Sequence, residues 1–143
     1  MDALTEAEQE FLVACLAVPG AGTNAIAGLD LEKTFGDELT RRAAAHLRDH
    51  ISSPLEGLDP EEELYTLMAK LSVRAAQSLG SADAIEGASI NIELLRVRRA
   101  IASARTSGEG GIAALAAREE ELRHRLDRII ERAMAAGAGD RVP

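Results

Sequence analysis

The chain has no tryptophan, and its only aromatic residues are two phenylalanines and one tyrosine among 143 residues. Strands favour aromatic and β-branched side chains, whereas helices favour Ala, Leu, Glu and Arg. Apolar residues make up 46% of the chain, and they are mainly Ala, Leu and Ile. The composition therefore predicts an all-α protein, and no segment has the pattern of a strand.

Cysteine is also scarce: Cys15 is the only one, which excludes a disulfide within the chain. A chain without disulfides suits a reducing compartment, so we expect a cytoplasmic protein. No apolar run approaches the roughly 20 residues that a membrane-spanning helix needs. The N-terminus has acids in place of the basic residues of a signal peptide, so we expect no contact with a membrane.

The chain has fewer basic than acidic residues: 16 Lys and Arg against 24 Asp and Glu, which gives a net charge of −8. A phosphate-binding surface needs clustered Lys and Arg, so we expect no direct binding of nucleic acid. Residues 1–80 contain 14 acids and 6 bases, whereas residues 81–143 contain ten of each, and every base there is Arg. This asymmetry predicts two parts with different surfaces.

Residues 1–80 have the apolar spacing of several short helices. Thr5 and Glu8 fit a capping box that would open the first helix, and Pro19–Gly22 would end it. A short helix over residues 23–27 and a turn over residues 30–36 should follow. The next helix is expected over Asp37–Ile51, with four residues facing inward: Leu39, Ala43, Leu47 and Ile51.

The segment Asp59–Glu62 predicts the start of a further helix. It places Asp at the N-cap, Pro at the first helical position and acids in the first turn. The apolar face of this helix is expected to contain Leu64, Leu67, Met68, Leu71 and Ala75. Leu79 and Gly80 should end it, and Ser81 can cap the next helix.

Two long helices joined by the loop Ser107–Gly111 are predicted for the rest of the chain. Their apolar residues alternate in steps of four and three, as in a coiled coil: Ile90, Leu94, Val97, Ile101 and Ala104, then Ile112, Leu115, Leu122, Leu126, Ile129 and Ala133. Glu119 interrupts the second series. Such a pair forms an antiparallel hairpin.

The predicted architecture is thus a short-helix bundle followed by a long antiparallel helical hairpin. We expect a bundle subdomain over residues 1–80, a hairpin subdomain over residues 81–136, and a flexible tail over residues 137–143. The two subdomains should be separable units joined through the long helix near Gly87.

His46 and His50 lie four residues apart, which is a metal-ligand spacing on a helix. Between them there is no glutamate of the zincin pattern, and Asp49 points to another side of the helix. We therefore interpret both histidines as partly exposed flank residues and predict no metal site. Cys15 lies on an apolar stripe with Phe11 and Leu12, which indicates a buried core residue rather than a nucleophile.

Arg96, Arg98 and Arg99 form the only local basic cluster, with Arg105 further along. We expect them to form ion pairs with the acids Glu119–Glu121 on the partner helix, because no aromatic residue is interleaved to stack a base. No set of residues in the sequence has the pattern of a catalytic or cofactor site. The sequence therefore favours a non-enzymatic protein-docking module without a cofactor.

Three segments together resemble the helicase-binding C-terminal domain of bacterial DnaG-type DNA primases. They are "EFLVACLAVPGAG" at Glu10–Gly22, "LDLEKTFGDELTRRAAAHLRDHISSPLEGL" at Leu29–Leu58, and "IELLRVRRAIASARTSGEGGIAALAAREEELRHRLDRII" at Ile92–Ile130. The first two are similar to the helical bundle of that domain and the third to its C-terminal hairpin. The resemblance spans nearly the whole chain, in the same order, although the GEGG loop and the Ala-rich hairpin depart from many relatives.

The resemblance implies a partner: the N-terminal domain of the hexameric, DnaB-type replicative helicase. Docking there would couple primer synthesis to unwinding, and the domain alone is expected to be a monomer. The full-length primase would be a DNA-directed RNA polymerase whose zinc-binding and polymerase domains lie upstream. Two alternatives remain open: the N-terminal domain of the helicase itself, and a freestanding helical adaptor or coiled-coil dimer.

The last helix offers a candidate docking surface. Ile130 and Met134 lie four residues apart and one position round from the predicted seam, so they share a neighbouring face. Arg123 and Arg125 could surround them and attract an acidic partner. The alternative is that the bundle's own helices bury the pair.

Overall fold

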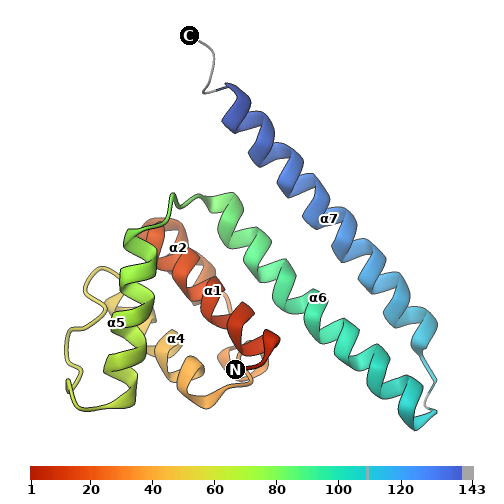
Figure 1. Cartoon of the computed structure of the whole chain (residues 1–143), viewed down its shortest axis with the longest axis horizontal. Helices are drawn as coiled ribbons and strands as arrows, with labels where there is room; N and C mark the ends of the chain where they lie inside the picture. The colour runs from red at the N-terminus through yellow and green to blue at the C-terminus, as the bar shows by residue number, and fades with distance from the viewer. Residues whose placement is uncertain (109, 140–143) are drawn as a thin grey trace. The chain divides into compact units, whose positions relative to one another are not determined.

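The computed structural model describes residues 1–108 and 110–139, with side chains as far as residue 136. These residues form seven helices and no strand (Figure 1). The all-α fold predicted from the composition is therefore confirmed. The chain divides into two compact units, Met1–Ala88 and Ser89–Pro143. The division falls inside one continuous helix, close to Gly87.

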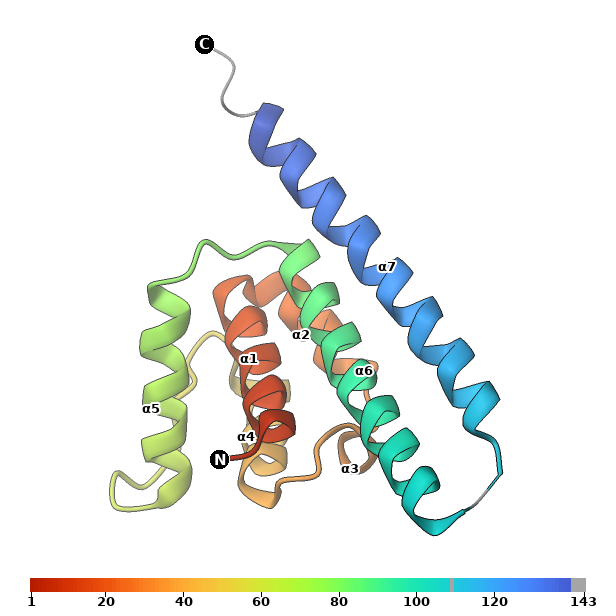
Figure 2. The same ribbon diagram turned by 45° about the vertical axis from the view of Figure 1, so that its right-hand side comes forward.

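The first unit is a bundle of short helices: α1 (Ala3–Ala17), α2 (Pro19–Ala27), α3 (Leu31–Thr34), α4 (Glu38–His50) and α5 (Glu63–Ala76). Helix α1 contacts α2, α4 and α5 (Figure 1, Figure 2). The core of the first unit is formed by large, fully buried side chains from several of its elements: Phe11, Leu12, Ile26, Phe35, Leu47, Met68 and Leu71. The rings of Phe11 and Phe35 lie 6.2 Å apart between centroids, so the only two phenylalanines of the chain meet in this core.

The predicted capping box of Thr5 and Glu8 is wrong. Helix α1 begins at Ala3, and the carboxylate of Asp2 caps it by accepting a 2.8 Å hydrogen bond from the backbone N–H of Thr5. Glu8 is therefore in the second turn rather than the first, and it is 1% exposed. A cap at Asp2 uses the same chemistry as a cap at Thr5, and it adds Ala3, Leu4 and Thr5 to the start of the helix.

Pro19 starts a helix as well as ending one, which corrects the prediction that Pro19–Gly22 is only a break. Helix α2 begins at Pro19. Proline is well suited to the first position of a helix, because the backbone N–H that it lacks would have no partner within the helix there. Gly22 lies where α2 meets α1. A Cβ added there would stand 2.2 Å from the carbonyl oxygen of Cys15. Only glycine allows this close approach of the two backbones.

The predicted turn over residues 30–36 contains one short helix, α3. Asp30 caps it by accepting hydrogen bonds from the N–H groups of Glu32 and Lys33. The helix predicted over Asp37–Ile51 is confirmed as α4, with those two residues as its caps. Its inward face differs in detail: Ala43 and Leu47 are buried as predicted, with Thr40 and Ala44 beside them, whereas Leu39 and Ile51 are half-buried.

Helix α5 begins later than the sequence predicts. Asp59 accepts a 3.0 Å hydrogen bond from the N–H of Glu61, but this closes a turn, and the helix starts at Glu63. The segment Asp59–Glu62 thus forms a capped turn directly before the helix, and not the first turn of the helix. The predicted apolar face is confirmed, since all five of its residues are buried: Leu64, Leu67, Met68, Leu71 and Ala75.

The two long helices, α6 (Ala82–Ser107) and α7 (Ile112–Gly139), pack antiparallel, as predicted (Figure 1). Ser81 caps α6 by accepting a 3.1 Å hydrogen bond from the N–H of Ala84. Gly108 and Gly111, with φ of 71° and 92°, allow the chain to reverse between the helices. The core of the hairpin contains the predicted residues Ile90, Leu94, Leu122 and Ile129, with Val97 and Leu126 packed against them.

The end of α7 departs from the prediction. Ala133 was expected in the seam, but it is exposed. The helix continues through Gly139, so part of the expected tail over residues 137–143 is helical, and residues 140–143 lie outside the described residues. Within residues 1–108 and 110–139, no helix is long and apolar enough to cross a membrane.

Candidate functional site

Residues 130–136 of α7 include no buried side chain. Every residue of the segment 130–136 is exposed, whereas Ile129, directly before it, is 6% exposed. Within this segment Ile130 is 48% exposed and Met134 is 69% exposed. The two lie one helical turn apart on the same face. The structure thus places the predicted apolar pair in contact with solvent, at the end of a helix that receives no packing there.

Of the two predicted flanking arginines, only Arg123 lies on the same side of the helix as the pair. Arg123 precedes Ile130 by seven residues, which is about two full turns, and it is exposed. Arg125 precedes Ile130 by five residues, about 140° around the helix, and it is half-buried. Arg125 therefore lies across the seam from the apolar pair.

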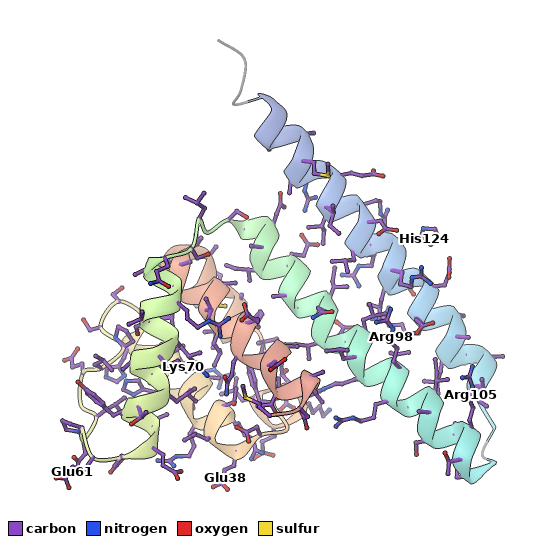
Figure 3. The ribbon with its side chains drawn as sticks, in the orientation of Figure 1. Glu38, Glu61, Lys70, Arg98, Arg105 and His124 are labelled. Carbon is purple, nitrogen blue, oxygen red and sulfur yellow. The ribbon has the colours of Figure 1, made fainter. Side chains whose placement is uncertain are left out.

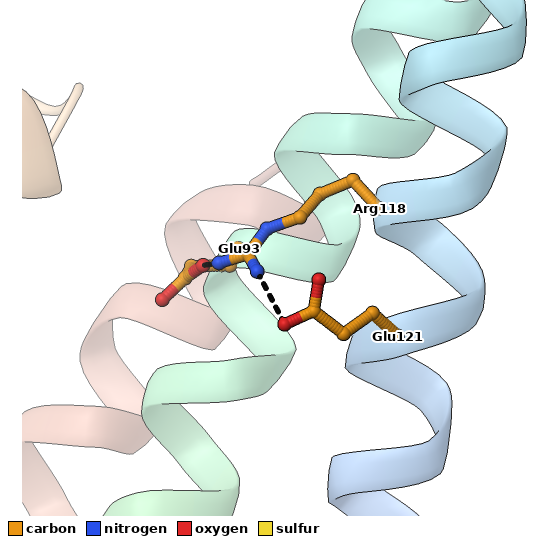
Figure 4. A network of polar contacts seen from close by, with 3 residues as sticks. All are labelled: Glu93, Arg118 and Glu121. Carbon is orange, nitrogen blue, oxygen red and sulfur yellow. Dashed lines mark hydrogen bonds and ion pairs between the residues drawn. The ribbon is translucent and has the colours of Figure 1, made fainter.

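Ion pairs hold the two helices of the hairpin in register. Arg118 of α7 donates a 2.7 Å hydrogen bond to Glu93 of α6 and lies 3.1 Å from Glu121 in its own helix (Figure 4). The hydrogen bonds to Glu93 and Glu121 raise the pKa of the Arg118 guanidinium. Arg98 donates a 3.1 Å hydrogen bond to Glu119, which confirms the predicted pairing between the basic cluster and the acids for that residue.

The pairing also explains why Glu119 interrupts the apolar series of α7. Its side chain is 28% exposed and faces Arg98 across the hairpin. Arg105 lies near the other end of α6 and is exposed (Figure 3). The arginines of the hairpin therefore serve, at least in Arg98 and Arg118, to fix its register.

His46 and His50 are stacked, with ring centroids 4.3 Å apart and planes inclined by 8°. The Nε2 atom of His46 lies 2.9 Å from the carbonyl oxygen of Pro54, and the Nδ1 atom of His50 lies 3.2 Å from that of His46. Each ring thus uses one nitrogen on a backbone carbonyl. Both rings are half-buried, and the contact of His46 with Pro54 ties α4 to the loop that follows it.

Cys15 of α1 is fully buried, and burial raises the pKa of its thiol to about 12. A nucleophilic cysteine needs the opposite shift, because the thiolate is the reactive species. Its surroundings match the packing role predicted from the apolar stripe. In the described part of the chain, His, Cys, Asp and Glu form no group of three or more that could hold a metal ion.

Sequence reasoning missed a groove in the first unit. An open groove of about 430 Å³ lies between the starts of α4 and α5, lined by Leu39, Glu61, Glu63, Thr66, Leu67 and Lys70. The sequence pattern predicts Leu39 in the core and the acids in the first turn of a helix, and neither prediction indicates a groove. A local signal was present, because residues 56–63 contain five acids and no base.

No protein-family model, no curated protein and no solved structure matches this chain.

Proposed function

We propose that the chain is a non-catalytic protein-interaction domain of a bacterial replicative primase. It docks onto the N-terminal domain of the DnaB-type replicative helicase and thereby couples primer synthesis to unwinding. The order of the two units, a short-helix bundle and then a long helical hairpin, agrees with the order that the resemblance to the primase domain implies.

The observation that carries the proposal is the exposed end of α7. Helices in water owe most of their stability to the packing of an apolar face, yet the segment 130–136 has no packed side chain. Ile130 and Met134 present an apolar strip one turn long. A strip of this kind fits a hydrophobic groove on a partner, and the flexible Met side chain adapts to the groove's shape.

The charges around the strip are mixed. At about 100° per residue, Arg123, Asp127 and Glu131 lie on the side of the strip, whereas the other three arginines of residues 122–136 lie on the opposite side of the helix. Exposed charges at the rim of an interface alter the association rate more than the affinity. The apolar pair should therefore supply most of the binding free energy.

The test is a calorimetric titration of a purified helicase N-terminal domain with the double variant Ile130→Ser, Met134→Ser. We expect a loss of about 2 kcal/mol or more in binding free energy, as for other buried interface residues. Circular dichroism should show unchanged helical content, because both side chains are exposed in the isolated chain. Unchanged binding by the folded variant would reject the contact.

Two controls separate binding from folding. Ile129→Ser removes a buried residue of the hairpin core, so it should lower the melting temperature, unlike the double variant. Arg125→Ser lies on the other flank and should leave the affinity nearly unchanged. Self-association of the chain in analytical ultracentrifugation, together with no binding to the helicase domain, would instead support the alternatives: a helicase N-terminal domain or a freestanding adaptor.

A further inference from the structure

We propose that the groove between the starts of α4 and α5 binds a basic amphipathic helix of a partner protein. The groove belongs to the first unit, and the argument for it does not depend on the helicase contact of α7. Leu39 and Leu67 form its apolar floor. Leu67 is 7% exposed, and Leu39 is half-buried, so an incoming apolar side chain can cover it.

The carboxylates around this groove are not used in ion pairs within the described part of the chain. Glu61 and Glu63 line it and are exposed, and Glu38 lies at the same end of the bundle (Figure 3). None of the three forms an ion pair with any residue that the structure describes. Lys70 is the single cation in the lining. The rim is therefore negative, and its charge is available to a cationic partner.

The helix dipole accounts for only part of this charge. Glu63 and Glu38 are in the first turns of α5 and α4, where a carboxylate is stabilised by the N-terminal dipole. Glu61 lies before α5, in the turn that Asp59 closes. Glu61 is exposed and lines the groove, so its carboxylate can face a partner.

The form of the surface selects the class of partner. Nucleic acids and anionic lipid surfaces are repelled by a negative rim, and small molecules favour sites that enclose most of their surface. An open groove suits a helix. Thr66, Lys70 and Val73 continue along one side of α5 in steps of four and three, and Val73 is 58% exposed. A helix lying along α5 can place an apolar ridge on the floor and its Lys or Arg side chains on the carboxylates.

The experiment uses the whole chain and a synthetic probe, an amphipathic helical peptide of Leu and Lys about four turns long. Amide shifts in a ¹⁵N spectrum should move saturably at Leu39, Thr66 and Leu67. The double variant Glu61→Lys, Glu63→Lys should weaken binding about tenfold or more, because two attractive charges become repulsive. Lys70→Glu should strengthen it by removing the one repulsive charge. A peptide with Glu in place of Lys should not bind.

A matched control changes the net charge equally but at another place. Glu32→Lys with Asp49→Lys also replaces two exposed acids of the first unit, and neither lines the groove. This variant should keep nearly the affinity of the parent chain. Equal weakening by the two double variants, shifts spread over the acidic surface, or no saturable binding would each overturn the proposal.

Discussion

The carboxylate of Glu8 in α1 accepts a 2.7 Å hydrogen bond from the backbone N–H of Gly36, 28 residues further along the chain. Glu8 is 1% exposed and Gly36 is exposed, so this part-buried contact ties the buried face of α1 to the loop before α4. Next to it, Gln9 donates a 3.4 Å hydrogen bond to the hydroxyl of Thr40. The core of the first unit is therefore joined by polar contacts as well as by apolar packing.

Replacing Glu8 by Ala should destabilise the chain by about 2 kcal/mol, because the N–H of Gly36 loses its charged acceptor and the buried space of the Glu8 side chain is left empty. Glu8→Gln should cost less, since the amide oxygen can still accept the bond. Urea unfolding followed by circular dichroism measures both. Glu6→Ala, an exposed change in the same helix, should alter the stability by no more than about 0.5 kcal/mol. Equal effects of the Glu6 and Glu8 changes would contradict the assignment.

These contacts mark the limit of prediction from the sequence. Apolar periodicity gave the buried face of α5 and the hairpin core of Ile90, Leu94, Leu122 and Ile129, because the spacing of a helix is a local property. Glu8 was assigned to a cap, since nothing local shows that Gly36 lies beside it. The missed close approach at Gly22 has the same cause.

The candidate site was predictable to a similar extent. The position of Ile130 and Met134 off the seam follows from helix geometry, and so does their exposure once the seam is known. The exposure of Ala133 was not predictable, because the sequence continues the seam spacing past the point where packing ends. The groove at Leu39 and Leu67 depends on how α4 and α5 are placed relative to each other. The spacing of apolar residues within one helix carries no information on that placement.

Gly22→Ala should destabilise the first unit by about 2 kcal/mol or more, through the forced separation of α1 and α2. The reason is the 2.2 Å distance between an added Cβ and the carbonyl oxygen of Cys15. Gly20 is the matched control: it lies in the same helix, and a Cβ there meets nothing within 4 Å. Gly20→Ala should stabilise by about 0.5 kcal/mol through lower chain entropy. Thermal melts of both variants give the comparison, and a stabilised Gly22→Ala chain would refute it.

Stability should fall in alkali through Cys15. Burial raises the pKa of this thiol to about 12 in the folded chain, from an ordinary value of 9.0. Between these pH values the folded thiol stays protonated while the unfolded thiol ionises. The contribution of Cys15 to the free energy of unfolding is therefore complete below pH 9 and is lost between pH 9 and about 12. Cys15→Ala should therefore lose less stability than the parent chain between neutral pH and about pH 10. Urea titrations at several pH values measure this dependence. If the free energies of unfolding of the parent chain and of Cys15→Ala fall equally with rising pH, Cys15 is not the cause of the loss.

The two units should reorient relative to each other in solution. The division falls inside α6 close to Gly87, and glycine weakens a helix by about 1 kcal/mol relative to alanine. Each unit has a buried core of its own. Residual dipolar couplings from Met1–Ala88 and from the hairpin should therefore fit two different alignment tensors.

Gly87→Ala provides the control for this motion. A stiffer helix should bring the two tensors closer in magnitude and orientation, while the couplings within each unit stay the same. The parent chain would contradict the prediction if one tensor fitted both units. That result would mean that a fixed, well-packed interface holds the units together, and the glycine in α6 would then have no role in their motion.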